Sequence, residues 1–217
     1  MRPENEKTYE TITDRQESKT ININFKDSEE LMLKISQLES CQRLRLNSNV
    51  TRHRLTQPQL DFRQLLPALP ELQTLSLTSV NLDPAGAATL DSAGAATLAE
   101  ILPQLPQLEG LQLRSNSIGS QGIEVLAGAL TQLSQLKELV LSNNQIGASG
   151  AEVLARALSQ LPALKKLELK VNQIGDQGEG ALAEALPQLP QLEELNLSHT
   201  QIGDQGVVAL AGALPQL

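Results

Sequence analysis

Glycine pairs separated by two residues are the first candidates for chemistry in this sequence, because glycine-rich loops can cradle a phosphate. The pairs are Gly119/Gly122, Gly147/Gly150, Gly175/Gly178 and Gly203/Gly206. A phosphate-binding loop would also need a following lysine or a longer glycine array, and neither follows these pairs. The pairs also recur at a constant spacing. We therefore interpret them as turns and close helix contacts within a repeated unit.

Cysteine and histidine, which could bind a metal or take part in nucleophilic catalysis, are rare in this sequence. The chain has one cysteine and two histidines, Cys41, His53 and His199. The histidines have no ligand spacing to Cys41 or to each other, and no catalytic triad can be assembled from them. Cys41 occupies a slot that other copies of the unit fill with leucine, which favours a small buried hydrophobe. We expect no catalytic residue, no metal site and no cofactor, and hence a protein that is not an enzyme.

The elements that position these residues belong to a repeated unit of 28 residues. The pattern LxxLxLxxNxIG opens at Leu108, Leu136, Leu164 and Leu192. Self-similarity at such a period indicates stacked supersecondary units, none of which buries its apolar side alone. Leucine dominates the composition, whereas the chain has two Phe, one Tyr and no Trp. We expect one elongated solenoid whose core consists of aliphatic ladders.

Each unit predicts a strand followed by a helix. The leucines of LxxLxLxx alternate, as in a strand with one buried face. An apolar stripe through Gly150, Leu154 and Leu158 then has helical spacing. This order produces a parallel sheet with helices on one side. Because helices are wider than strands, we expect a curved α/β solenoid with the sheet on the concave side and the helices on the convex side.

Alignment on the second strand leucine extends the array toward the N-terminus. The aligned positions are Ile23, Leu46, Leu77, Leu113, Leu141, Leu169 and Leu197. One unit is longer because LDPAGAAT at 82–89 is followed by LDSAGAAT at 90–97, a tandem duplication of eight residues. We interpret the duplication as a longer loop or an extra turn on one edge of the solenoid, with a functional loop as the alternative.

The two ends of the chain differ from the middle. Residues 1–19 are charged and poor in apolar residues, which predicts a disordered polar tail. Residues 20–40 combine an alternating strand with a helix that Ser28 would cap, so we interpret them as a capping unit. The array at 41–217 ends without a polar cap. We expect either a longer protein or a partner over the last repeat, with self-association as a further possibility.

These residues resemble the leucine-rich repeat family, specifically its ribonuclease-inhibitor-like subfamily, from about Cys41 to the end of the chain. The resemblance implies that the repeat asparagine bonds backbone groups in the bend and forms a ladder between units. The matching positions are Asn49, Asn116, Asn144 and Asn172, whereas Val80 and Thr200 depart from the pattern. We expect a weaker ladder at these two steps. The resemblance also implies binding of proteins through the concave sheet and its bordering loops.

Parallel strands about 4.8 Å apart would turn equivalent solvent-facing residues into columns. One column is Arg43, Thr74, Gly110, Glu138, Lys166 and Glu194; the next is Arg45, Ser76, Gln112, Val140, Glu168 and Asn196; the third is Asn47, Thr78, Arg114, Ser142, Lys170 and Ser198. Lys166 is flanked by Glu138 and Glu194, which predicts local ion pairs. These columns do not form a basic track for nucleic acid.

Candidate partner-contact residues fall into two groups. The cationic group comprises Arg43 and Arg45 on one strand with Arg52 and Arg54 in the adjoining loop. It lies in a positive stretch of a chain whose net charge is −8, so it would steer an acidic partner to that end. The simpler interpretation is a solvated edge paired with acidic residues such as Glu39, and contact with an anionic patch on a protein partner is the functional alternative. The second group comprises Arg114, Val140, Lys170, Val171 and His199.

The leading functional hypothesis is a non-catalytic protein–protein interaction scaffold, because curved repeat arrays present extended surfaces. Two alternatives are a GTPase regulator resembling Ran GTPase-activating proteins and a bacterial effector that acts inside a host cell. No stretch approaches 18 uninterrupted apolar residues, so we expect no signal peptide, no membrane span and a cytoplasmic location. The expected partner is a protein, with no nucleic acid and no membrane.

Overall fold

The computed structural model describes residues 11–13, 20–24, 42–47, 63, 66–79 and 91–213. In this part of the chain, eight strands form one sheet in the order of the sequence. The strands are β1 (Thr11–Thr13), β2 (Thr20–Asn24), β3 (Arg43–Asn47), β4 (Thr74–Thr78), β5 (Gly110–Gln112), β6 (Glu138–Val140), β7 (Lys166–Glu168) and β8 (Glu194–Asn196). Strands β2 to β8 are parallel, whereas β1 pairs with β2 in antiparallel orientation.

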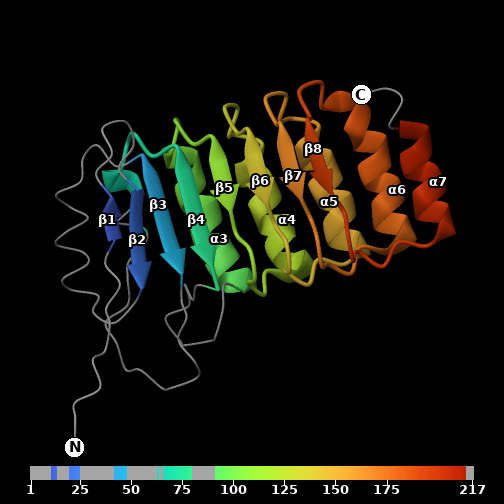
Figure 1. The fold of residues 1–217 in the computed structure, drawn as a ribbon, viewed down its shortest axis with the longest axis horizontal. Coiled ribbons are helices and arrows are strands. Elements are labelled where there is room, and N and C mark those ends of the chain that lie inside the picture. The colour runs from blue at the N-terminus through green and yellow to red at the C-terminus, as the bar shows by residue number, and fades with distance from the viewer. Residues whose placement is uncertain are drawn as a thin grey trace, which may run out of the picture.

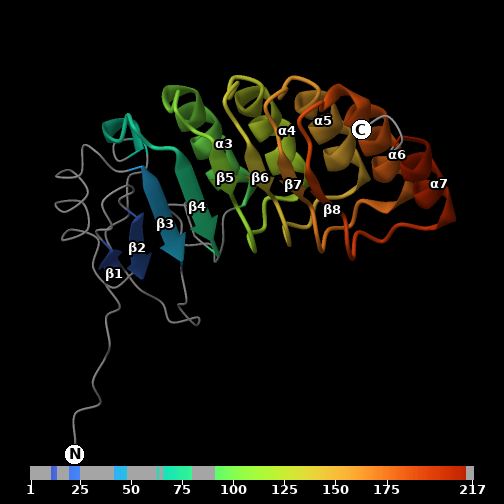
Figure 2. The same ribbon diagram turned by 45° about the horizontal axis from the view of Figure 1, so that its top comes forward.

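Helices form a second layer along one face of the sheet (Figure 1). They are α3 (Ser92–Ile101), α4 (Gly119–Leu130), α5 (Ala148–Leu158), α6 (Gly175–Ala185) and α7 (Asp204–Ala213), with short 3-10 turns η1 (Leu66–Ala68), η2 (Leu102–Gln104) and η3 (Leu186–Gln188). Each α-helix packs against the next one along the chain, and the turned view shows the row of helices beside the row of strands (Figure 2). The predicted solenoid, with its sheet on the concave side and its helices on the convex side, is confirmed.

The strand register follows the alignment of the repeats. Ile23 pairs with Leu46, and Leu46 pairs with Leu77. Between β6 and β7, Leu139 pairs with Leu167, and both side chains are at most 1% exposed. The leucines therefore form ladders that are buried between the sheet and the helices, which is the aliphatic core that the repeat predicts.

The glycine pairs have structural roles in turns and helix packing, as the repeat interpretation predicts. Gly175 has φ of +62°, a conformation that most other residues adopt only with strain. A Cβ atom at Gly178 would lie only 2.8 Å from the Cβ atom of Ala151 on the preceding helix α5. Gly175 thus permits the turn into its helix, as does Gly119 with φ of +63°, and Gly178 permits adjacent helices to approach closely.

The asparagine ladder is present where the structure describes it. The Nδ2 of Asn144 donates to the carbonyl oxygen of Leu113 in the preceding repeat at 2.7 Å and to that of Leu141 in its own repeat at 3.0 Å. Asn116 and Asn172 make the equivalent pairs of bonds. Thr200 instead donates to Leu197 of its own repeat. The ladder is therefore weaker at Thr200, as expected, while Asn49 and Val80 lie outside the described residues.

Strand β1 lies within the segment that we expected to be a disordered tail. Its three residues alternate threonine with isoleucine, a β-branched run that suits pairing with the free edge of β2. The disorder prediction is therefore wrong for Thr11–Thr13. The expected capping helix with Ser28, and also Cys41, lie outside the described residues.

The second copy of the duplicated segment begins a helix rather than a loop. The Asp91 carboxylate accepts hydrogen bonds from the backbone N–H groups of Ala93 and Gly94, both at 3.0 Å, and so caps α3. The first copy lies outside the described residues. None of the helices in the described part of the chain is long and apolar enough to cross a membrane.

Candidate partner-binding surface

The candidate surface is the solvent-facing side of β3 to β8 together with the loops that follow these strands. The strand pairing places Glu138, Lys166 and Glu194 side by side, and Arg45 beside Ser76. The first two predicted columns are therefore confirmed along the described strands. These columns define which side chains from different repeats can act together on one ligand.

The arginine end of this surface is described only in part. Arg43 and Arg45 are both exposed, two residues apart on β3, and they point to the same face. Arg52 and Arg54 lie outside the described residues. The grouping of all four arginines stays a prediction.

A carboxylate cluster surrounds Lys166 in the C-terminal half of the surface. Its Nζ lies 3.1 Å from Glu168, 3.2 Å from Glu194 and 3.9 Å from Glu138. Hydrogen bonding to Glu168, and then to Glu194, raises the pKa of Lys166 above its ordinary value of 10.5. Lys166 is therefore charged at neutral pH, and its charge is compensated within the sheet surface rather than offered to a partner.

An ion pair joins two strands that flank one predicted contact residue. Arg114, which follows β5, donates through a guanidinium nitrogen to the Glu168 carboxylate of β7 at 2.6 Å. Val140 lies on the intervening strand β6 and is 3% exposed, and Ser142, which follows β6, is also buried. Val140 is therefore not an exposed contact residue.

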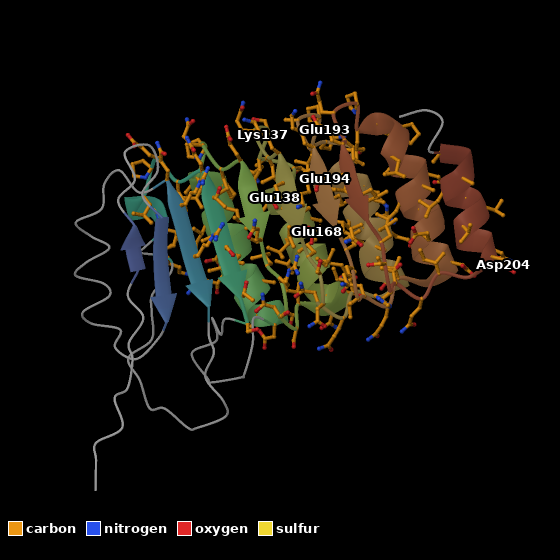
Figure 3. The ribbon with its side chains drawn as sticks, viewed as in Figure 1. Lys137, Glu138, Glu168, Glu193, Glu194 and Asp204 are labelled. Atoms are coloured by element: carbon orange, nitrogen blue, oxygen red, sulfur yellow. The ribbon has the colours of Figure 1, made fainter. Side chains whose placement is uncertain are left out.

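Further ion pairs line the edge where the strands begin. Lys137 contacts Glu109 at 2.7 Å, and Lys165 contacts Glu193 at 2.6 Å. Figure 3 places Lys137 and Glu193 along this edge, with Glu138, Glu194 and Glu168 on the sheet surface below it. Exposed pairs of this kind contribute little stability, typically about 0–1 kcal/mol. They leave the C-terminal half of the surface with mixed, locally balanced charge.

Val171 combines two unusual properties. It is 43% exposed, and it is held at φ of +57° in the loop that follows β7. The same loop position is left-handed in the other repeats, where the residues are Ser79, Ser115, Asn143 and His199. Asparagine tolerates this conformation, but a β-branched residue is strained in it. Val171 thus places an apolar side chain in solvent at the cost of backbone strain.

Replacing Val171 by asparagine should therefore stabilise the fold. The residue at the equivalent position of the preceding repeat, Asn143, has the same φ of +57°. Relief of a strained left-handed residue is expected to raise the free energy of unfolding by about 1 kcal/mol, measured by urea denaturation. The matched control is Val125→Asn on α4, where valine is 45% exposed in a right-handed helix. An equal gain at Val125 would show that strain at Val171 is not the cause.

Lys170 and His199 flank Val171 on this surface. Lys170 is half-buried, and among the described residues it forms no ion pair. His199 occupies in the next repeat the same left-handed position as Val171, and it is exposed.

Comparison with known families supports the repeat assignment. Residues 132–155 and 188–211 match the family model described as a leucine-rich repeat. These two stretches are similar to leucine-rich repeats. Both matched stretches contain a strand and most of the following helix, β6 with α5 and β8 with α7. No curated protein matches the sequence.

Two solved structures resemble this fold. Leiomodin-1 Actin-Binding Site 2 has a TM-score of 0.53 at 16% identity, with 68% of this chain and 81% of that chain covered. The C-terminal domain of tropomodulin from Caenorhabditis elegans has a TM-score of 0.53 at 14% identity, with 68% and 84% covered. At these identities the likeness shows the fold alone.

Asp176 connects two neighbouring repeats. It lies in the first turn of α6. Its carboxylate accepts from the backbone N–H groups of Gly203 at 2.6 Å and Gly206 at 3.1 Å. It therefore caps α7 of the following repeat, as the Ser120 hydroxyl accepts from Gly147 N–H in an earlier step. This capping of a neighbouring helix becomes apparent when equivalent positions of adjacent repeats are compared, rather than residues that are adjacent in sequence.

Proposed function

We propose that this chain is a non-catalytic scaffold that binds a protein partner through its concave sheet surface and the bordering loops. The observation that carries the proposal is Val171, which is 43% exposed at a strained φ of +57° on that surface. A strained exposed valine lowers the stability of the free protein, and such outliers cluster at sites of function. Burial of its side chain against a partner would offset part of this cost.

The charges on the surface indicate how a partner would be recognised. Around Lys166 and Arg114 the cations are already paired with carboxylates of the same sheet. Binding there would depend on shape, apolar contact and hydrogen bonds, with a weak dependence on salt. At the other end, Arg43 and Arg45 would steer an acidic segment of the partner, and the proposal retains Arg52 and Arg54 in this role.

Two further observations support the proposal. One structural neighbour is named as an actin-binding site, so an array of this fold serves there as a protein-binding surface. The unit length of 28 residues and the alternation of strand with helix support a ribonuclease-inhibitor-like subtype. A cytoplasmic location is part of the same proposal.

Site-specific photo-crosslinking tests which face binds. A photoreactive amino acid would replace Val171 or Arg45 on the concave surface, and Val125 on the convex helix α4 as the matched control. In an extract of the source organism, the two concave positions should yield the same crosslinked protein, and Val125 should not. Because Val125 and Val171 are 45% and 43% exposed, the comparison holds accessibility constant.

Equal crosslinking from both faces, or none from the concave positions, would contradict the proposed binding face. Self-association is a separate hypothesis, supported by Val207 and Val208 on α7, which are 57% and 71% exposed. A crosslinked product of twice the mass of the chain would indicate a second copy rather than another protein. Sedimentation of the unmodified protein across concentration distinguishes these two products.

A further inference from the structure

A glutamate lies buried in the helix layer, away from the partner-binding surface. Glu179 is in the first half of α6 and is 0% exposed. Neither oxygen of its carboxyl group has a hydrogen-bond partner among the described residues. An ionised carboxylate in such a place carries a large desolvation penalty, so a neutral side chain is strongly favoured there.

Glu179 occupies a position that is apolar in every other described helix. The equivalent residues, each directly after the second glycine or aligned with it, are Ala95, Ile123, Ala151 and Val207. This position faces the glycine of the next helix: a Cβ atom at Gly178 would lie 2.8 Å from the Cβ atom of Ala151, and one at Gly206 would lie 3.2 Å from the Cβ atom of Glu179. Glu179 therefore lies at the contact between α6 and α7.

The charged groups on the surrounding helices do not neutralise Glu179. Its pKa rises from 4.5 to about 7, chiefly because of burial, and the negative charge of Asp176 raises it further. Asp176 itself is committed to the backbone N–H groups that begin α7. On the flanking helices α5 and α7, Glu152 accepts a hydrogen bond from Gln177, and Arg156 and Asp204 are exposed. Glu184, on α6 itself, is also exposed.

The repeat that α7 completes lacks one side-chain contact that other repeats make with their neighbours. Its threonine lacks the bond to the preceding repeat that Asn172 makes with the Leu141 carbonyl. Its strand leucine Leu195 is only partly buried, whereas the equivalent Leu167 is 1% exposed. Repeat arrays open most readily where the interface between neighbouring units is weak.

We propose that the repeat formed by β8 and α7 is a pH-sensitive unit, which stays docked on α6 while Glu179 is protonated and opens when Glu179 ionises. The carboxyl group is compatible with the apolar helix contact only in its neutral form. Ionisation would place an unpaired charge in that contact, beside the charge of Asp176. Opening hydrates the Glu179 carboxylate and exposes the face of α6 that α7 covers.

The direction of the pH dependence follows from the proton affinities of the two forms. The docked form holds the proton up to about pH 7, whereas a hydrated carboxyl group in the open form would release it near pH 4.5. Docking is therefore fully favourable below about pH 4.5 and is weakened as the pH rises through about 7. The opening equilibrium should increase roughly 300-fold over the whole range, of which about 30-fold falls between about pH 5.5 and 8.5.

Hydrogen exchange measured by mass spectrometry tests this proposal. After correction for the intrinsic exchange rate, protection of the α7 amides should fall about 30-fold from near pH 5.5 to near pH 8.5. Protection of the α4 and α5 amides should stay constant. In Glu179→Gln, which keeps the shape and removes the charge, α7 protection should not change with pH.

Two control variants separate Glu179 from other titrating groups. Glu184→Gln removes an exposed carboxylate from the same helix, and His199→Asn removes the imidazole of the same repeat. Both should retain the wild-type change. Constant α7 protection in the wild type, or an unchanged pH dependence in Glu179→Gln, would overturn the proposal, as would equal loss in α4 and α5. Should Glu179→Gln not fold, carbon NMR of the wild type decides, because a Glu179 carboxyl that titrates at its ordinary value of 4.5 also overturns it.

Discussion

Replacing Leu167 by alanine is expected to lower the free energy of unfolding by about 2–5 kcal/mol. Leu167 is the central residue of β7, is 1% exposed, and pairs across the sheet with Leu139 and Leu195. Its side chain lies in the core between sheet and helices. Truncation would remove apolar contacts and leave a cavity that the stacked repeats on both sides prevent from collapsing.

Urea denaturation followed by far-UV circular dichroism measures this loss, since the chain has no Trp to report by fluorescence. The control is Ser198→Ala, an exposed residue that follows the next strand. Its hydroxyl bonds the neighbouring Asn196 side chain at 2.8 Å, and the expected change is within about 0.5 kcal/mol. If the two variants lost the same stability, the assignment of inward and outward positions along the strands would be wrong.

The repeat pattern predicts the backbone well for a physical reason. A strand has a period of two, so the alternating leucines determine which face is buried, and identical spacing in adjacent units sets the register. The pairing of Ile23 with Leu46 shows that this holds even where the unit departs from 28 residues. The capping strand β1 was missed because its three residues have too few neighbours to form a pattern.

Which side chains of the solvent-facing columns are buried was harder to predict than the register of the strands. Val140 occupies a solvent-facing column but is 3% exposed, and the Arg114 side chain of one flanking repeat reaches Glu168 of the other. The reach of a long side chain across two strands depends on its rotamer, which the repeat pattern does not encode. Ser142, which the sequence also places in a solvent-facing column, is buried, and its hydroxyl lies 3.5 Å from the same carboxylate.

The sequence does indicate that Glu179 is unusual, but only when equivalent positions of different repeats are compared. Read along α6, it is one polar residue among several, close to Asp176 and Glu184. Read across the repeats, it is a carboxyl group in a column of alanine, isoleucine and valine. In a solenoid the neighbours of a residue are its equivalents in adjacent units, so comparison across repeats identifies buried polar groups better than helical periodicity does.

Replacing Asn172 by alanine is expected to lower the free energy of unfolding by about 3 kcal/mol or more. The Asn172 amide nitrogen donates to the carbonyl oxygens of Leu141 and Leu169, at 3.1 and 2.7 Å. Its Oδ1 accepts from the backbone N–H groups of Asn144 and Ile146, both at 3.0 Å. Alanine would leave these buried backbone groups without their partner, and an unsatisfied buried group costs about 1–3 kcal/mol.

The terminal repeat supplies the matched comparison for this prediction. Thr200 stands at the equivalent position and is 1% exposed, and its hydroxyl donates to the Leu197 carbonyl of its own repeat rather than to the preceding repeat. Thr200→Ala should therefore cost about 1 kcal/mol, because it removes one local bond. A cost for Thr200→Ala as large as that for Asn172→Ala, by the same urea denaturation, would show that the bonds between repeats add nothing to stability. The larger cost at Asn172 would instead show that these side-chain bonds couple one repeat to the next, a contribution that Thr200 does not make.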